Sequence, residues 1–313
     1  MKYQHVLSYV ASQLWAIDPR KLQELLAVLA YRAAGHTFTP EDIQARIGDG
    51  GAASSATQGH DVAIVPIRGV IAHRMGMMDD TSGGTSCERI SAMLQRVMAD
   101  ASIGTIVLDV DSPGGTVTGC QELAGEIFEL RGRGTKRIVA VVNGLMASAA
   151  YWIASQADEI VCIPSGSAGS IGVFCAHEDL SAALEQEGIK ITLISAGTYK
   201  TAGNPTEPLS DDERAVLQAR VDEAYRQFVN DVARGRGVTP AAVRHGYGEG
   251  RVLTATDAKA AGLIDRIATM DATLARLVGR APAGDLRAEN PADEITDHAG
   301  PALAAAARRS RLL

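Results

Sequence analysis

Apolar β-branched runs alternate with amphipathic helical patterns along the middle of the chain. The runs are nearly continuous in Val and Ile, which is typical of strands buried on both faces of a sheet. The predicted strands cover 62–71, 105–110, 137–142, 159–163, 170–174 and 189–195, and the predicted helices lie near 88–99, 121–130 and 179–187 and directly after Ser148. This order predicts an α/β fold with largely parallel strand pairing.

Further helical patterns lie on both sides of this region. Leucines at helical spacing predict a helix over 19–34, and a capping box at Ser210 opens a long helix over 210–234, followed by shorter helices at 240–245 and 255–261. The stretch GDGGAASSATQG is rich in small residues, and the last part of the chain has little periodicity. The sequence therefore predicts a small N-terminal helical extension (1–47), a flexible linker (48–60), a main domain (61–280) and a disordered tail (281–313).

Composition narrows the class of protein. A formal net charge of -7 in 313 residues provides no basic field for phosphate backbones, so no nucleic-acid partner is expected. The N-terminus lacks a secretory pattern and no apolar stretch approaches about 18 residues, which predicts a cytoplasmic protein without a membrane anchor. The four cysteines are scattered and have no zinc-type spacing, so we expect buried thiols, no metal and no cofactor: Cys87, Cys120, Cys162 and Cys175.

Three apolar segments run into small residues: LDVDSPGGTV (108–117), VVNGLMASAAYWIAS (141–155) and SGSAGSIGVF (165–174). Small side chains at a strand-to-helix junction let backbone N–H groups approach a ligand, and a helix N-terminus there stabilises negative charge. Such junctions can form an oxyanion hole.

Ser148 lies between alanines where a helix should begin. Its hydroxyl could be a nucleophile with a helix dipole behind it, or an ordinary helix cap, and the local sequence favours the cap. Gly114 and Gly115 could form a turn that faces this junction and supplies an oxyanion donor, or a simple tight turn.

A nucleophilic serine needs a base within hydrogen-bond reach. Of the histidines, His73, His177 and His245 fall inside the main domain. Lys200 follows an apolar run and has no acidic neighbour within three residues; it could be a base if desolvated, or a solvated loop residue.

Taken together, the motifs resemble those of the signal peptide peptidase A family and its phage relatives, the minor capsid protein C or head maturation proteases. The motifs are SPGG at 112–115, ASAAYWIAS at 147–155, AGSIGV at 168–173 and TYKTAGNP at 198–205. The resemblance covers about 62–267 and implies a Clp/crotonase-type fold of repeated ββα units. That superfold also implies a homo-oligomer.

The resemblance also implies roles for individual residues. Ser148 would be the nucleophile and Lys200 the general base, with Ser170 orienting the lysine amine. The backbone N–H groups of Gly114 and Ala149 would form the oxyanion hole. One departure is Ala149-Ala150 where the family usually has Gly-Gly, which narrows the space above the serine but keeps the N–H donor.

Because no anchor is predicted, the chain resembles the phage proteases more than the membrane-bound bacterial enzymes. The expected function is a phage or prophage head maturation protease in the host cytoplasm or procapsid, acting on scaffold, portal or capsid proteins. Four alternatives stay open: a Clp-type base at His177, a bacterial signal-peptide-degrading peptidase, a crotonase-type acyl-CoA enzyme, and a capsid-assembly factor with a vestigial site.

Overall fold

The computed structural model describes residues 10, 12–33, 61–74 and 84–279. The chain divides into two compact units, Met1–Arg280 and Ala281–Leu313, and every described residue belongs to the first. The predicted linker (48–60) and the predicted tail (281–313) lie outside the described residues. The division of the first unit into an extension and a main domain stays a prediction.

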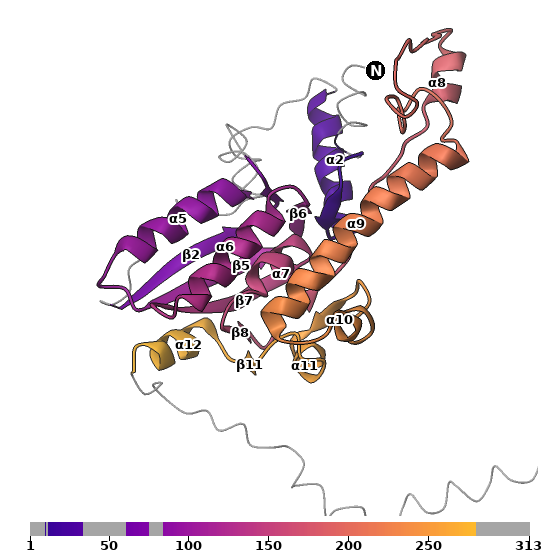
Figure 1. Ribbon diagram of the computed structural model, residues 1–313. Coiled ribbons are helices and arrows are strands. Elements are labelled where there is room, and N and C mark those ends of the chain that lie inside the picture. Colours follow the sequence, from indigo (N-terminus) through magenta and orange to yellow (C-terminus); the bar gives the residue numbers. More distant parts are fainter. Residues whose placement is uncertain (1–9, 11, 34–60, 75–83, 280–313) are drawn as a thin grey trace, which may run out of the picture. The chain divides into compact units, whose positions relative to one another are not determined.

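The main sheet is mostly parallel (Figure 1). Strand β7 pairs in parallel with β5, β8 and β9; β5 pairs in parallel with β2, and β8 with β11, whereas β10 joins β9 antiparallel. The strands are β2 (Val62–Arg68), β5 (Thr105–Ser112), β7 (Arg137–Ala147), β8 (Glu159–Cys162), β9 (Ser167–Gly169), β10 (Val252–Thr254) and β11 (Arg266–Ile267). The predicted α/β class with largely parallel pairing is confirmed.

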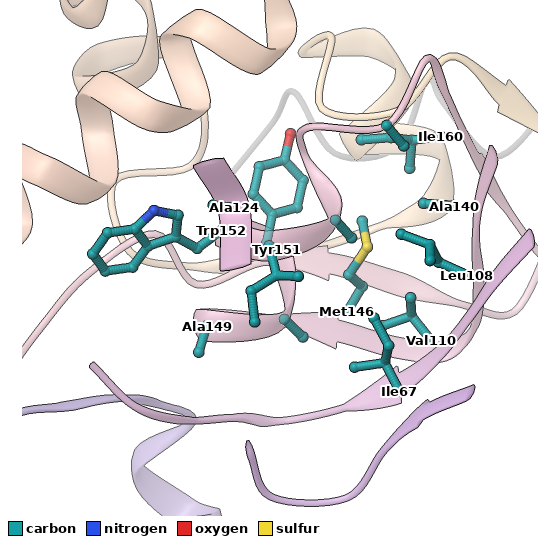
Figure 2. Close-up of a cluster of buried hydrophobic side chains, with 14 of the residues drawn as sticks. Ile67, Leu108, Val110, Ala124, Ala140, Met146, Ala149, Tyr151, Trp152 and Ile160 are labelled. Carbon is teal, nitrogen blue, oxygen red and sulfur yellow. The ribbon is translucent and has the colours of Figure 1, made fainter. Parts of the chain in front are cut away.

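Apolar side chains cover both faces of this sheet, as the continuous Val and Ile runs predict. On one face, residues such as Ile67, Leu108 and Met146 pack against helices that follow the strands (Figure 2). On the other face, valines of β5 and β7 pack against helix α12 (Met270–Leu277). The helices on the first face are α5 (Cys87–Ala99), α6 (Cys120–Gly132), α7 (Ala149–Ala154) and α9 (Asp211–Arg236).

A second, small sheet has the order β1-β6-β3-β4. Its strands are β1 (Trp15–Ile17), β3 (Ile71–Ala72), β4 (Thr85–Ser86) and β6 (Gly114–Thr116). Strand β1 lies within the N-terminal extension, which was predicted to be helical, and this strand was not predicted. After it, Asp18 accepts a hydrogen bond from the Arg20 N–H at 2.9 Å and caps helix α2 (Pro19–Ala33), so the predicted helix over 19–34 is confirmed with a strand before it.

Two predicted strands are wrong. Residues 170–174 form only one isolated bridge, between Phe174 and Trp15. Residues 189–195 form no strand and are exposed: 47% for Ile189, 46% for Ile191 and 97% for Ile194. Their pattern is that of a strand, but no described segment pairs with them.

The remaining helices lie where the patterns predict them. Helix α9 begins with a complete capping box between Ser210 and Glu213. The others are α8 (Ser181–Gln186), α10 (Pro240–Gly246) and α11 (Ala255–Ala260). Three of the four cysteines are buried and all four are free thiols, while Cys175 is half-buried. Within the described part of the chain, no helix is both long and apolar enough to cross a bilayer.

Candidate active site

Ser148 occupies the junction between strand β7 and helix α7. It has a backbone φ of 56°, which is uncommon for a residue with a side chain, and it is almost completely buried. It stands at the cap position of α7, yet its side chain makes no capping hydrogen bond. The Oγ instead donates to the Gly172 carbonyl at 3.5 Å, the outer limit of a hydrogen bond. The helix-cap interpretation therefore does not account for this serine.

Ser170 occupies the equivalent position on the neighbouring strand. Strands β7 and β9 run in parallel and pair Ala147 with Gly169, so the two serines follow directly at the same edge of the sheet. The Ser148 N–H donates to the Gly169 carbonyl at 2.8 Å, which ties the two ends together. Ser170 has the same φ of 56°. Two strained serines side by side indicate a functional site rather than ordinary strand ends.

The glycine pair after strand β5 lies against Ser148. A Cβ added to Gly114 would lie 2.9 Å from the Ser148 Cβ and 2.2 Å from the Ala16 carbonyl oxygen, and its φ of 99° is left-handed. A Cβ on Gly115 would lie 1.7 Å from the Ile71 carbonyl oxygen. Glycine is needed at both positions because Ser148, β1 and β3 all approach this turn closely.

The two backbone donors predicted for the oxyanion hole differ in their partners. The Gly114 N–H donates to the Ser112 Oγ at 3.2 Å, and that hydroxyl donates onward to the Gly69 carbonyl at 2.6 Å. Ala149 is the first residue of α7, where a backbone N–H has no acceptor within the helix. No hydrogen bond from the Ala149 N–H is found among the described residues.

Helix α7 is held by its aromatic residues, which point into the core (Figure 2). Trp152 stacks on Phe228 of α9 with ring centroids 4.6 Å apart, and its Nε1–H donates to Asp231 at 2.8 Å. Burial raises the pKa of Asp231, although the Trp152 hydrogen bond and the Arg234 charge act in the opposite direction. The Tyr151 hydroxyl donates to the Leu263 carbonyl at 2.9 Å. Ser148 thus directly precedes a helix that is firmly packed in the core.

Lys200 lies apart from this group. It is exposed and lines a surface depression of 290 Å³ together with His177 and Asn204. No hydrogen bond joins Lys200 to Ser148 or to Ser170 among the described residues. His177, the alternative base, lies within 3.1 Å of the Asn204 carbonyl through its Nε2, on the same side as Lys200. The structure therefore brings together Ser148, Ser170, Gly114 and Ala149, and leaves both candidate bases outside.

The part of the candidate site formed by β1 is not predicted by the sequence. Ala16 and Ile17 pair with Gly115 and Gly114, so the N-terminal extension reaches the glycine turn. The signal was present in the run Trp15-Ala16-Ile17, which is apolar but too short to identify as a strand.

Residues 131–281 match the model of peptidase family S49. Among curated proteins, the chain is 37% identical over 182 residues to the head-tail preconnector protein GP5 of Enterobacteria phage P21, covering 58% of this chain and 36% of that protein. It is 35% identical over 206 residues to the capsid assembly protease C of Escherichia phage lambda, covering 66% of this chain and 46% of that protein.

A protein of Enterococcus faecium named as a signal peptide peptidase is 31% identical over 174 residues, which are 56% of this chain and 50% of that protein. The chain thus spans between about a third and a half of the length of these relatives. The predicted resemblance to the signal peptide peptidase A family and its phage relatives is confirmed, and the segment that matches peptidase family S49 carries Ser148, Ser170 and Lys200.

Proposed function

We propose that this protein is a serine peptidase in which Ser148 is the nucleophile and Lys200 the general base. The observation that carries the proposal is the conformation of Ser148: a buried serine with positive φ and no capping bond, against the Gly114 turn. Strain of this kind persists where the surrounding structure maintains it, as at active sites. The match of residues 131–281 to a peptidase family supports the same function.

In this mechanism the Ser148 Oγ attacks the substrate carbonyl carbon while its proton passes to the Lys200 amine. The N–H groups of Ala149 and of the glycine turn stabilise the oxyanion. Ser170 orients the lysine amine. The C–N bond then breaks, the leaving amine takes the proton from Lys200, and water hydrolyses the acyl-enzyme by the reverse sequence of proton transfers.

The position of Lys200 adds a requirement to this mechanism. A lysine acts as a base when it is desolvated, because burial disfavours its charged form. The side chain of Lys200 is exposed, as are the apolar side chains just before it: Ile189, Ile191, Leu193 and Ile194. A cluster of this kind is typical of a surface that another protein covers. We therefore propose a homo-oligomer in which a second copy covers this segment. The Lys200 of one copy then lies beside the Ser148 of the other.

Helix α9 supports the proposal of a second copy. Near its start, Leu217 lies 3.2 Å from where a Cβ on Gly203 would be, which holds the Lys200 loop there. Farther along, Phe228 stacks on Trp152, one turn from Ser148. At 1.5 Å per residue, Leu217 and Phe228 are about 17 Å apart along the helix. The loop and the nucleophile are thus attached to separate parts of α9.

The fold type and the substrates are part of the proposal. The parallel sheet with nucleophile and glycine turn at its edge supports a Clp/crotonase-type fold of ββα units. The phage relatives include a protein named as a capsid assembly protease, and we propose that this chain likewise cleaves scaffold, portal or capsid proteins during head maturation. The expected setting is the host cytoplasm.

A fluorophosphonate probe tests the nucleophile. The expected result is covalent labelling of Ser148, located by peptide mapping, and loss of labelling in Ser148→Ala. A vestigial site would leave both proteins unlabelled, and labelling at another serine would overturn the assignment.

Mixing two inactive variants tests the second copy. Ser148→Ala and Lys200→Ala should each lack peptidase activity, and their mixture should regain it because some sites receive an intact serine and an intact lysine from different copies. A His177→Ala variant should keep activity. If Lys200→Ala remains active and His177→Ala does not, the base is His177. If the two single variants are inactive and the mixture stays inactive, the dyad forms within one copy.

A further inference from the structure

We infer that strand β1 occupies the groove in which an extended substrate binds, so that the chain's own N-terminal segment competes with substrate at the active site. This inference rests on the proposed peptidase function. It follows from the place of β1 between two backbone segments that both contact the nucleophile.

One wall of the groove is strand β6. Its antiparallel register with β1 pairs Trp15 with Thr116, Ala16 with Gly115 and Ile17 with Gly114. The Val117 N–H donates to the Leu14 carbonyl at 3.1 Å and the Asp18 N–H donates to the Pro113 carbonyl at 2.9 Å. Since hydrogen-bonded pairs alternate along an antiparallel ladder, the Ala16–Gly115 pair between them is also of the hydrogen-bonded kind.

The other wall is the segment that ends at Phe174. Trp15 and Phe174 exchange both backbone hydrogen bonds, with the Trp15 N–H donating at 2.8 Å and the Phe174 N–H donating at 3.0 Å. Two residues earlier in this segment, the Gly172 carbonyl accepts the hydrogen bond of Ser148. Strand β1 is therefore paired on both sides, and each side leads directly to Ser148.

The middle of β1 comes closest to the nucleophile. The Ala16 carbonyl oxygen and the Ser148 Cβ both lie within 3 Å of the same point, the place where a Cβ on Gly114 would be. Ala16 is fully buried there. A larger side chain or a second strand would not fit beside the glycine turn while β1 is present. A substrate bound by backbone pairing must displace β1.

Side chains fix β1 from outside the groove. Trp15, Ile17 and Leu22 form their own apolar cluster, and Phe174 packs against it. The Trp15 Nε1–H donates to the Val10 carbonyl at 2.9 Å. This cluster belongs to the extension and its supports, separate from the main core, so substitutions there can release β1 while the main core stays intact.

Binding of a labelled peptide tests the inference without catalysis. The probe is a fluorescein-labelled peptide with the sequence of residues 12–18, SQLWAID, measured by fluorescence anisotropy against full-length Ser148→Ala protein. Adding Trp15→Ala should tighten binding by about tenfold, because the competing strand is released and the open groove becomes more populated. Gln23→Ala, an exposed position on α2, is the matched control and should bind as the parent does.

A reversible lock compares the bound and released states of β1 within a single variant, with β1 held by a covalent bond in place of the Trp15 side chain. Trp15→Cys with Thr116→Cys places two thiols on paired residues of the non-hydrogen-bonded kind, at a separation that a disulfide can span. The oxidised variant should exclude the probe and the reduced one should bind it, while the parent protein should respond to neither treatment. If the oxidised double-cysteine variant, its reduced form and Trp15→Ala all bind the probe equally, the inference is overturned.

Hydrolysis by the same variants with Ser148 intact separates the two proposals. Faster hydrolysis by the released than by the locked form is the expected result. If no form hydrolyses any peptide but probe binding follows the lock, the peptidase proposal fails and the inference stands. If all forms hydrolyse equally, the peptidase proposal stands and the inference fails.

Discussion

The two halves of the proposed dyad lie in contrasting surroundings. Ser148 is almost fully buried, follows the central strand of the sheet, and is fixed through Trp152 to α9. Lys200 is exposed, in a segment without a strand, near a short helix with no buried residue. The proposed nucleophile is fixed within one copy, whereas the proposed base lies on the surface. Under the proposed mechanism, one copy completes the fold without completing the active site.

The largest expected effect comes from removing the buried member of the proposed dyad, Ser148. Ser148→Ala should lower kcat by about a thousandfold or more, because it removes the hydroxyl that forms the acyl-enzyme in the proposed mechanism. Ser165→Ala, an exposed serine before β9, serves as the control and should retain full activity. Turnover of a fluorogenic peptide measures both. If Ser148→Ala keeps more than a tenth of the parent activity, Ser148 is not the nucleophile, and the contrast between a buried nucleophile and an exposed base fails.

The glycine turn sharpens the description of the buried half. Gly115→Ala should lower activity by about a hundredfold, since moving β6 displaces the groups at the nucleophile. It should also reduce the free energy of unfolding by about 1–3 kcal/mol, because the new Cβ would overlap the Ile71 carbonyl.

Gly125→Ala is the matched control for this substitution. Apart from the backbone of its own helix α6 and its chain neighbours, no described residue has an atom within 4 Å of a Cβ at Gly125, so the variant should be active and at least as stable as the parent. Urea unfolding and peptide turnover distinguish the two alanines. Equal behaviour of the two would show that the turn does not position the site.

A charged substitution in the exposed apolar segment before Lys200 tests the proposed contact between copies. Ile194→Asp should lower activity by about tenfold and shift the protein toward smaller species, because a carboxylate at a covered interface is costly. The free energy of unfolding should change by less than about 0.5 kcal/mol, since Ile194 is 97% exposed in one copy. Light scattering coupled to gel filtration measures the first effect. Unchanged mass together with unchanged activity would contradict the proposed assembly.

The smallest expected effect concerns the link between α7 and α9. Burial raises the pKa of Asp231 above its ordinary value of 3.8, so the stability that this group contributes is full below that pH and is lost as pH rises through its folded-state pKa. Asp231→Asn keeps an acceptor for the Trp152 indole and removes the titration. Relative to the parent, the variant should become progressively more stable as the pH rises from below 3.8 toward neutrality. Urea unfolding at several pH values tests this prediction. A difference in the free energy of unfolding between variant and parent that stays constant with pH would contradict it.

The sequence predicted the buried half of the molecule better than the exposed half. The continuous apolar runs identified β2, β5, β7 and β8, because a strand covered on both faces must be apolar throughout. The junction at Ser148 followed from small residues next to such a run. Residues 189–195 carry the same kind of pattern, but a pattern shows only that a strand needs a partner, and the described chain offers none.

The missed strand has a different physical reason. Trp15-Ala16-Ile17 is too short to show a period, and its pairing with Gly114–Thr116 joins residues about a hundred positions apart. Contacts of that range depend on the completed fold. For Lys200, the sequence left two alternatives open, a desolvated base and a solvated loop residue. In one copy of the chain Lys200 is a solvated loop residue.

The covalent attachment of β1 to the chain has a consequence for where substrate can be cleaved. A tethered strand is present at its binding site at an effective concentration of about millimolar, whatever the dilution of the protein. A free peptide of similar affinity would need a comparable concentration to displace it. Under the proposed competition, the protein would be inactive in dilute solution and would act where its substrate is packed densely around it.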